Sequence, residues 1–283
     1  MIGLHVSIAG SIEFAFDRAI EVGANTFQIF TRNPNQWRFG PLAEEAIEAF
    51  RSRRRSSGFR AVVDHMPYLP NLASPVSSTI KASRASLKEE VKRCDQLGVD
   101  YLVAHLGSHL GKGTAVGVAN VASACREAVD ASGGETVILL ENMAGQRNCV
   151  GARFEDLRSI LDKAGREDRL GVCLDSCHLF AAGFDLRNEA SVRGTMELFD
   201  EAVGFERLKV VHLNDSKGPL GSRLDRHEDV GKGKIGRSGV RAVLGYKDMT
   251  KHPIILETPY TELREMKESL AVVRSLLPRG VSG

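Results

Sequence analysis

The sequence predicts an α/β protein that folds as a (β/α)8 TIM barrel. Eight short apolar runs alternate with longer amphipathic stretches along the 283 residues, which is the pattern of repeated strand-then-helix units. The apolar runs are nearly continuous in Val, Ile and Leu, as expected for strands that are buried on both faces. No linker or low-complexity segment divides the chain, so we expect one domain over residues 1–283.

The elements follow in order from the N-terminus. We expect Ser11 to cap the first helix, Gly23 to end it, and Gly98 to end the third helix. The predicted strands are Ile2–Val6, Thr26–Phe30, Phe59–Val63, Tyr101–Ala104, Thr136–Leu140, Leu170–Leu174, Leu208–Val211 and Ile254–Leu256. The predicted helices are Ile12–Val22, Leu42–Ser57, Ser77–Leu97, Ala115–Ala131, Phe154–Lys163, Glu189–Ala202, Ser238–Leu244 and Thr261–Leu277. An open doubly wound sheet is the alternative, but the turn Ser7–Ser11 lacks the G-x-G-x-x-G pattern of such folds.

The composition limits the class of protein. With 42% hydrophobic residues and a net charge of +2, the chain can build a large core, and any contact with nucleic acid would be a local patch. The N-terminus lacks the pattern of a signal peptide, and no apolar stretch approaches the ~18 residues that span a bilayer. The five cysteines are irregularly spaced, which is typical of a reduced protein. We therefore expect a cytoplasmic enzyme without membrane contact.

Side chains that bind divalent metals follow the predicted strands. The runs Asp175–His178, His212–Asp215 and Asp225–His227 place carboxylates beside imidazoles, the ligand set of catalytic zinc. Such groups lie on the C-terminal side of their strands, where barrel enzymes build active sites. The ligand candidates on this rim are His65, His105, Glu141, Asp175, His178, His212, Asp225, His227 and Glu257.

Each of these residues has an ordinary interpretation when taken alone. A single histidine after a strand is usually a structural group, and Asp or Glu there often caps a helix. Four buried carboxylates without cations would destabilise the fold severely, so the joint placement indicates metal. Nine ligands suit two or three ions, zinc by the number of imidazoles, although Mn²⁺ tolerates the same carboxylates. Of the other histidines, we expect His5 beside the site, His109 in a loop and His252 on the opposite rim.

The motifs and their order resemble those of endonuclease IV, the metal-dependent apurinic/apyrimidinic (AP) endonucleases of base excision repair. The resemblance runs from His5-Val6-Ser7 to Glu257-Thr258-Pro259. Its most specific segments are His105–His109, Glu141–Gly145, Leu174–His178, His212–Lys217 and Asp225–His227. It implies a deoxyribonuclease IV, a phosphoric diester hydrolase that cuts duplex DNA 5′ to an abasic site. The implied products are a 3′-hydroxyl and a 5′-deoxyribose phosphate, and trimming of blocked 3′ ends is also implied.

The resemblance further implies three zinc ions per chain. His65, His105 and Glu141 would hold the first, and Glu141 would bridge to the second. Asp175, His212 and Glu257 would complete the second, and His178, Asp225 and His227 would hold the third. A metal-bound hydroxide would attack the phosphodiester, and the third ion would stabilise the leaving oxygen. Glu141 is therefore the expected catalytic residue, as bridge and positioner, and we expect no nucleophilic side chain.

Contacts to duplex DNA containing abasic sites are expected on the same rim. The loop after the seventh strand is locally basic, and Arg226 and Lys232 are its expected DNA contacts; the alternative is an ordinary solvated loop. Tyr68 and Leu69 are candidate wedges for the opened duplex, with loop packing as the alternative.

The segment Thr31–Trp37 matches the DNA-facing loop of the family. Asn35 stands where the family often carries a basic residue, and Arg32 is the candidate replacement. We expect Trp37 to be a packing anchor under this loop. We also expect the protein to act as a monomer.

Two other functions fit parts of the pattern. A metal-dependent sugar isomerase or epimerase of the same barrel type would use an acid/base pair, but would give Asp225-Arg226-His227 no obvious role. A catalytically inactive barrel that binds damaged DNA would have no need of all nine ligands.

Overall fold

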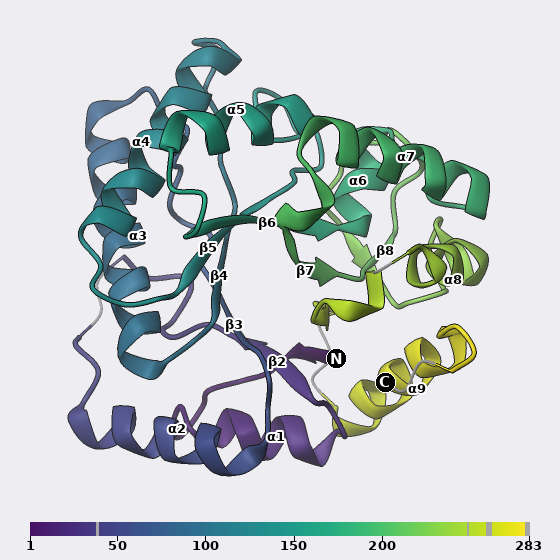
Figure 1. Cartoon of the computed structure of the whole chain (residues 1–283), viewed down its shortest axis with the longest axis horizontal. Coiled ribbons are helices and arrows are strands. Elements are labelled where there is room, and N and C mark those ends of the chain that lie inside the picture. The colour runs from purple at the N-terminus through teal and green to yellow at the C-terminus, as the bar shows by residue number, and fades with distance from the viewer. Residues whose placement is uncertain (38–39, 248, 259–261, 281–283) are drawn as a thin grey trace.

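The computed structural model describes residues 1–37, 40–247, 249–258 and 262–280, and in it eight parallel strands close into a barrel. Neighbouring strands follow the order β1-β10-β7-β6-β5-β4-β3-β2, and the helices lie outside them (Figure 1). The TIM-barrel prediction is confirmed. The barrel strands are Ile2–His5 (β1), Thr26–Ile29 (β2), Val62–His65 (β3), Tyr101–Ala104 (β4), Val137–Glu141 (β5), Leu170–Asp175 (β6), Leu208–His212 (β7) and Ile254–Leu256 (β10).

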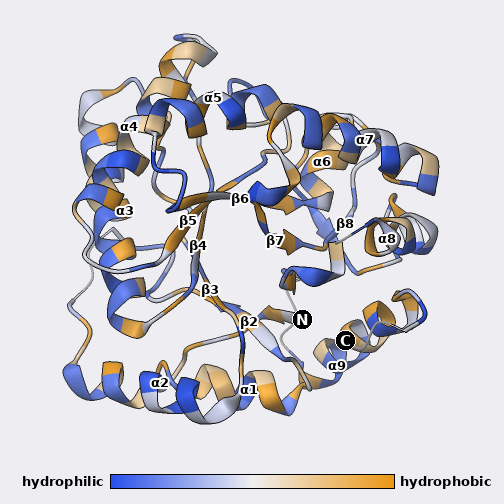
Figure 2. Cartoon of the chain, in the orientation of Figure 1, coloured by the Kyte–Doolittle hydropathy of each residue, from blue (hydrophilic) through white to orange (hydrophobic). Residues whose placement is uncertain are grey.

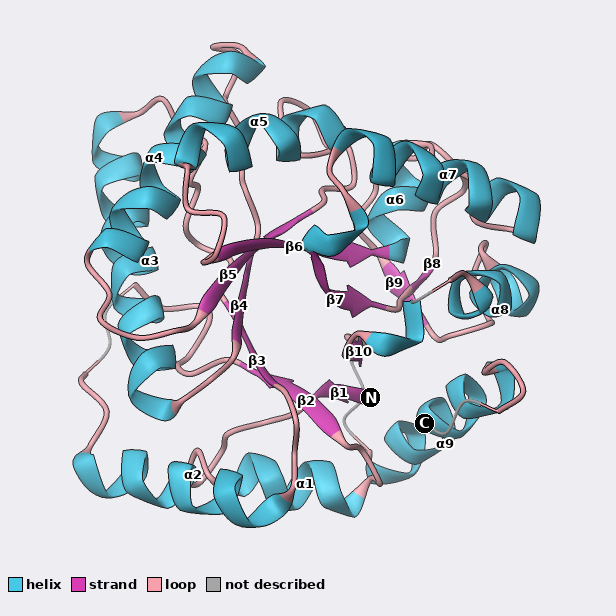
Figure 3. Ribbon diagram, viewed as in Figure 1, coloured by secondary structure: helices cyan, strands magenta, loops and turns pink. Residues whose placement is uncertain are grey.

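Helices form a ring around the strands (Figure 3). Strands β5 and β7 are largely hydrophobic, whereas the helices carry hydrophilic residues as well (Figure 2). The helices are Phe14–Glu21 (α1), Glu44–Ser57 (α2), Ser77–Leu97 (α3), Thr114–Asp130 (α4), Phe154–Ala164 (α5), Ser176–Ala182 (α6), Glu189–Ala202 (α7), Gly236–Gly245 (α8) and Leu263–Leu276 (α9). Short 3-10 turns precede two strands, at Phe205–Arg207 (η1) and Met249–Lys251 (η2). Within the described part of the chain, no helix combines the length and the apolar character that crossing a membrane requires.

Two local predictions are wrong. Helix α1 begins only at Phe14, and the Ser11 hydroxyl donates to the Glu13 carboxylate instead of capping the helix. Strand β3 begins at Val62 and not at Phe59, whose ring packs edge-on against Phe16 and Phe27 before the strand starts. The predicted start of the last helix, Thr261, lies outside the described residues.

Two elements near the rim were not predicted. Helix α6 starts directly at the end of β6, and a small antiparallel sheet joins Asp215–Ser216 (β8) to His227–Glu228 (β9). Both lie in the segments that carry candidate ligands, so they determine where those side chains point.

The barrel interior contains an apolar layer just below the predicted site. It consists of one residue from each of six strands, Val63, Val103, Leu139, Cys173, Val210 and Ile255. Side chains of a strand point to the same face at every second residue. In each of these six strands, the residue two positions after the apolar one therefore belongs to the next layer toward the C-terminal rim. Those residues are His65, His105, Glu141, Asp175, His212 and Glu257.

Candidate metal centre

Four overlapping groups of ligand atoms, each within 4.8 Å, gather at the C-terminal rim and together contain all nine predicted ligands. Six of these residues form the layer above the apolar interior. The other three come from the start of α6 and from the loop after β7.

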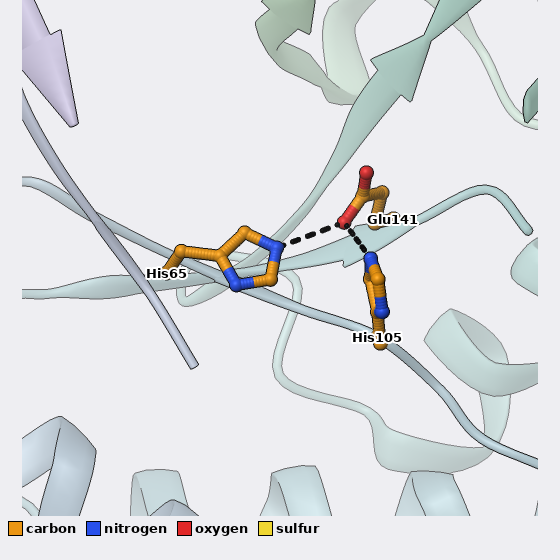
Figure 4. A group of neighbouring side chains, drawn as sticks. All are labelled: His65, His105 and Glu141. Atoms are coloured by element: carbon orange, nitrogen blue, oxygen red, sulfur yellow. Dashed lines mark hydrogen bonds and ion pairs between the residues drawn. The ribbon is translucent and has the colours of Figure 1, made fainter. Parts of the chain in front are cut away.

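The first group joins His65, His105 and Glu141. The Nε2 atoms of His65 and His105 lie 3.2 Å and 3.0 Å from the same Oε2 of Glu141. Figure 4 shows both imidazoles pointing toward this one oxygen. Glu141 is fully buried. Two imidazole nitrogens and one carboxylate oxygen thus face one point, as ligands of a single ion would.

The second group uses the other oxygen of Glu141. Its Oε1 lies 3.1 Å from Nδ1 of His212, which in turn lies 3.0 Å from Oε2 of Glu257. Asp175 completes the group. The two oxygens of Glu141 therefore face different groups, which is the geometry of a carboxylate that can bridge two ions.

The remaining predicted ligands meet around Asp225. Its Oδ1 lies 3.2 Å from Nε2 of His178 and 3.5 Å from Nε2 of His227. His105, His178 and Asp225 form one group within 4.8 Å, whereas His227 groups with Asp175 and Cys177. Cys177 was not among the predicted ligands; it lies two residues after Asp175, in the first turn of α6, which brings it close.

The start of α6 explains the motif Asp175–His178. Asp175 ends β6 and caps α6, because its Oδ1 accepts a hydrogen bond of 2.7 Å from the backbone N–H of His178. This leaves Oδ2 of Asp175 to face His227, with Nε2 at 3.6 Å. The cap also fixes His178 one helical turn along, beside Asp225. Asp175 therefore caps the helix with one carboxylate oxygen and keeps the other oxygen facing the candidate ligands.

The imidazoles are oriented as metal ligands usually are. His65 Nδ1 lies 2.7 Å from the carbonyl oxygen of Met66, and His178 Nδ1 lies 2.9 Å from that of Asn142. A ring N–H that donates to a carbonyl leaves the opposite nitrogen free to bind metal. In the described structure, the buried Nε2 atoms of His178 and His227 lie near carboxylate oxygens, at 3.2 Å to 3.6 Å, without the geometry of a hydrogen bond. These two nitrogens and the surrounding carboxylates fit bound divalent ions.

Electrostatics within the cluster point the same way. Burial alone would lower the pKa of His105 and His212, but the Glu141 carboxylate and, for His212, neighbouring Cys173 and Glu257 raise both values. Burial would raise the pKa of Glu141 and Glu257, but the imidazoles hold both well below the usual range. The carboxylates therefore require positive charge between them, which protons or metal ions can supply.

Comparison with known proteins identifies the family. The model of a family described as a xylose isomerase-like TIM barrel matches residues 16–276. A probable endonuclease 4 of Methanoculleus marisnigri is 46% identical over 98% of both chains. The chain belongs to the endonuclease IV family.

Solved structures agree with this family. The crystal structure of endonuclease IV from Thermus thermophilus is 38% identical and covers 97% of this chain and 98% of its own, with a TM-score of 0.87. A D-tagatose 3-epimerase-like protein reaches a TM-score of 0.72 at 18% identity, over 97% of this chain and 96% of that one. The second likeness shows the shared fold alone.

Two amides that were not predicted from the sequence hydrogen-bond the candidate ligands of this endonuclease IV family member. Gln28 donates to Oε1 of Glu257 at 2.6 Å and places its own oxygen 2.8 Å from Nε2 of His212. Asn214 donates to Oδ2 of Asp175 at 2.6 Å. Gln28 is a polar residue within the buried strand Thr26–Ile29, and it shares a face of that strand with Thr26. A buried polar residue in a barrel strand is a signal that could have pointed to a role beside the site.

The three other histidines lie as expected. His5 is beside Gln28, with its Nδ1 at 3.3 Å from Nε2, and burial lowers the pKa of His5 to about 4. His109 is a loop residue that accepts from the Gly113 N–H at 3.0 Å. His252 contacts Phe205 of η1, on the side where the strands begin.

A cavity of about 350 Å³ opens over the ligands of this endonuclease IV family member. Tyr68, which is 58% exposed, lines it, and its ring lies 5.8 Å from that of His65. Leu69 is also exposed. Lys217 and Arg226 line the same cavity, which places two cations beside the ligands. Partial burial of its hydroxyl and the charge of Glu257 raise the pKa of Tyr68.

Lys232 is placed apart from this cavity. It forms an ion pair of 2.8 Å with Asp229 and lines a smaller cavity, about 210 Å³, beside α9. Asn35 is exposed, in the loop after β2.

Two expectations for the loop after β2 are wrong. Arg32 cannot replace a surface cation, because it is 6% exposed and its Nε bonds Glu90 at 2.7 Å. Trp37 is 43% exposed and is therefore not buried as an anchor.

Proposed function

We propose that the protein is a metal-dependent AP endonuclease of DNA repair, which hydrolyses the phosphodiester 5′ to an abasic site in duplex DNA. The products would be a 3′-hydroxyl and a 5′-deoxyribose phosphate, with trimming of blocked 3′ ends as a second activity. The observation that carries the proposal is the fully buried Glu141, whose two oxygens face two separate ligand groups. The high identity to probable endonuclease 4 proteins supports it.

The proposed cofactor is zinc, three ions per chain. His65, His105 and Glu141 would hold the first, and Glu141, Asp175, His212 and Glu257 the second, in line with two of the observed groups. His178, Asp225 and His227 would hold the third; both imidazoles lie within 3.5 Å of one Asp225 oxygen. Zinc, when bound, acts as a Lewis acid and lowers the pKa of water to about 7.

The side chains around the ligands have distinct proposed roles. Lys217 and Arg226 would bind phosphates that flank the scissile bond, because they line the cavity over the ligands. Tyr68 and Leu69 would fill the gap left by the missing base and exclude water from the cavity. Lys232 and Asn35 would make outer contacts to the duplex, and the protein would act as a monomer.

A nicking assay tests this function. A duplex with one tetrahydrofuran abasic analogue should be cut on the 5′ side of the lesion by zinc-loaded protein, and an intact duplex should not. Analysis of the same sample should find close to three zinc ions per chain. A zinc-loaded protein that leaves the lesion uncut would contradict the proposal.

The Glu141→Gln variant tests the bridging carboxylate. We expect it to lower kcat by at least about 1,000-fold, since charge at the reacting centre is lost, while duplex affinity changes by less than about fivefold. Its zinc content should also fall. Glu127→Gln, which removes a half-buried carboxylate paired with Arg84 on the barrel exterior, is the control and should leave all three quantities unchanged. Near-normal turnover in Glu141→Gln would show that the bridging role is wrong.

A further inference from the structure

A buried charged cluster lies beneath the loop that follows β2. Glu90 and Arg93 of α3 are 0% and 4% exposed, and Arg32 of the loop is 6% exposed. On α3, Ser86, Glu90 and Arg93 are spaced by four and then three residues, so they share one helical face. That face is turned toward the loop, as their hydrogen bonds show.

One guanidinium ties two distant points of this loop together. Arg93 Nη2 donates to the carbonyl oxygen of Thr31 at 2.6 Å, and Nη1 donates to that of Gly40 at 3.1 Å. Arg93 Nε also donates to the Thr31 hydroxyl at 3.1 Å. Because a guanidinium is planar and rigid, its fork fixes the separation between these two carbonyls.

Glu90 holds the second guanidinium of the cluster. Its carboxylate accepts from the Thr31 hydroxyl and, at 2.7 Å, from Nε of Arg32. Arg32 then donates to the carbonyl of Gln36 at 2.9 Å and to Ser86 at 2.6 Å. The start, middle and far side of the loop are therefore all bonded to buried charges. We name Arg32, Glu90 and Arg93 the loop clamp.

The clamp leaves outer side chains of the loop exposed to solvent. Asn35, Gln36 and Trp37 are exposed. Phe30, the residue before Thr31, packs against His65 and Tyr68 with ring centroids 5.7 Å and 5.4 Å apart. The loop thus starts at the ligands and presents its outer face on the same rim.

We infer that Glu90 and Arg93 are positioning residues that preform the described part of this loop, residues 31–37 and Gly40, for duplex DNA through the carbonyls of Thr31, Gln36 and Gly40. The choice of duplex DNA as the ligand rests on the proposed function. The hydrogen bonds that hold the loop do not depend on that function. A loop that is ordered before binding loses less conformational freedom when the duplex arrives. The clamp therefore acts on substrate binding and leaves the chemistry at the ligands unchanged.

Trp37 makes the order of the loop measurable without any substrate. It is the one tryptophan of the chain, so intrinsic fluorescence excited at the indole reports this loop alone. Arg93→Lys keeps the charge but loses the fork that spans two carbonyls. We expect acrylamide quenching of Trp37 to rise about twofold in this variant and its fluorescence anisotropy to fall. Arg84→Lys, on the same helix but paired with Glu127, is the matched control and should change neither.

Steady-state kinetics on the abasic duplex give the second measurement. For Arg93→Lys we expect KM to rise about tenfold, because the freed loop must be ordered on binding, while kcat stays within about twofold. Glu90→Gln, which is nearly isosteric, should give the same pattern and serves if Arg93→Lys does not fold. Zinc content should equal that of the wild type, which separates loop positioning from damage to the ligands.

Results that differ from these expectations overturn the inference. Unchanged Trp37 quenching in a folded clamp variant would show that the clamp does not hold the loop. Increased quenching with unchanged KM would show that loop order has no part in DNA binding, and a fall confined to kcat would place the effect at the ligands. If the wild type fails to nick, the proposed function fails by itself, and Trp37 quenching still decides whether the clamp orders the loop.

Discussion

At the scale of single residues, two amide side chains hold the candidate ligands in place through hydrogen bonds. Gln28 bonds both His212 and Glu257, and Asn214 bonds both Asp175 and Glu257. Each amide fixes the direction in which a ligand atom points. Such partners of a ligand commonly change metal affinity by about 10- to 100-fold when they are lost.

Gln28→Leu is the clearest test of this support. The change removes a donor to Glu257 and an acceptor for His212 while nearly preserving volume. We expect zinc affinity, measured by competition with a chelator, to weaken by about 10- to 100-fold. Gln96→Leu on the outer helix α3 should leave the affinity unchanged. Equal affinities in the two variants would mean that Gln28 does not orient the ligands.

The gathering of the nine candidate ligands at one rim could be predicted from the sequence, whereas the partners of the amides could not. A histidine or carboxylate at the end of an apolar run is a visible signal, and the spacing of two from Val63 to His65 or from Leu139 to Glu141 repeats on six strands. Gln28 carries no charge and lies within a strand, so its partners appear only once β1, β2, β7 and β10 meet.

At the scale of elements, the misses have physical causes. Helix α6 spans seven residues, and six of them are buried, so no alternation of polar and apolar residues marks it as a helix. Strands β8 and β9 have two residues each, too few for a strand pattern. Burial by the rest of the molecule, rather than local pattern, determines both elements.

Asp215 shows what the β8–β9 segment needs. It lies in the run His212–Asp215, yet it is not among the predicted ligands. Its carboxylate instead accepts hydrogen bonds from the backbone N–H groups of the next residue and of the segment that leads into α8. The donors are Ser216, Gly231, Gly233, Ile235 and Gly236. A Cβ at Gly233 would approach Oδ1 of Asp215 to 2.5 Å, so this contact requires glycine.

Asp215→Asn should therefore destabilise the fold without changing the metal. Its new amide would point N–H groups at the Gly231, Gly233 and Gly236 donors, and we expect the free energy of unfolding to fall by about 3 kcal/mol in denaturant titrations. Asp162→Asn, at an exposed pair on α5, should cost less than about 0.5 kcal/mol. Zinc content should match the wild type; loss of an ion would make Asp215 a ligand after all.

At the scale of the whole molecule, the ligand layer links most of the barrel. Six of the eight strands each end in or just before a ligand residue, and these strands are far apart in the chain. Metal that binds the folded protein and not the unfolded chain stabilises the fold by mass action. Removal of metal by a chelator should therefore lower the melting temperature of the entire barrel rather than loosen one loop.

The size of this loss should depend on pH in a defined direction. The carboxylates raise the pKa of His105, His178 and His212, so at low pH protonated imidazoles replace the metal as partners of Glu141. That stabilisation is present below the ordinary pKa of histidine and is lost as pH rises through the raised values. We expect chelation to lower the melting temperature more at about pH 8.5 than at about pH 6, because imidazoles with raised pKa values keep their protons at the lower pH. Protein with excess zinc should vary less over this range, because zinc keeps the carboxylates compensated where protons leave. An equal loss at both pH values would mean that imidazole protons do not replace the metal, and the buried carboxylates would then need another source of positive charge.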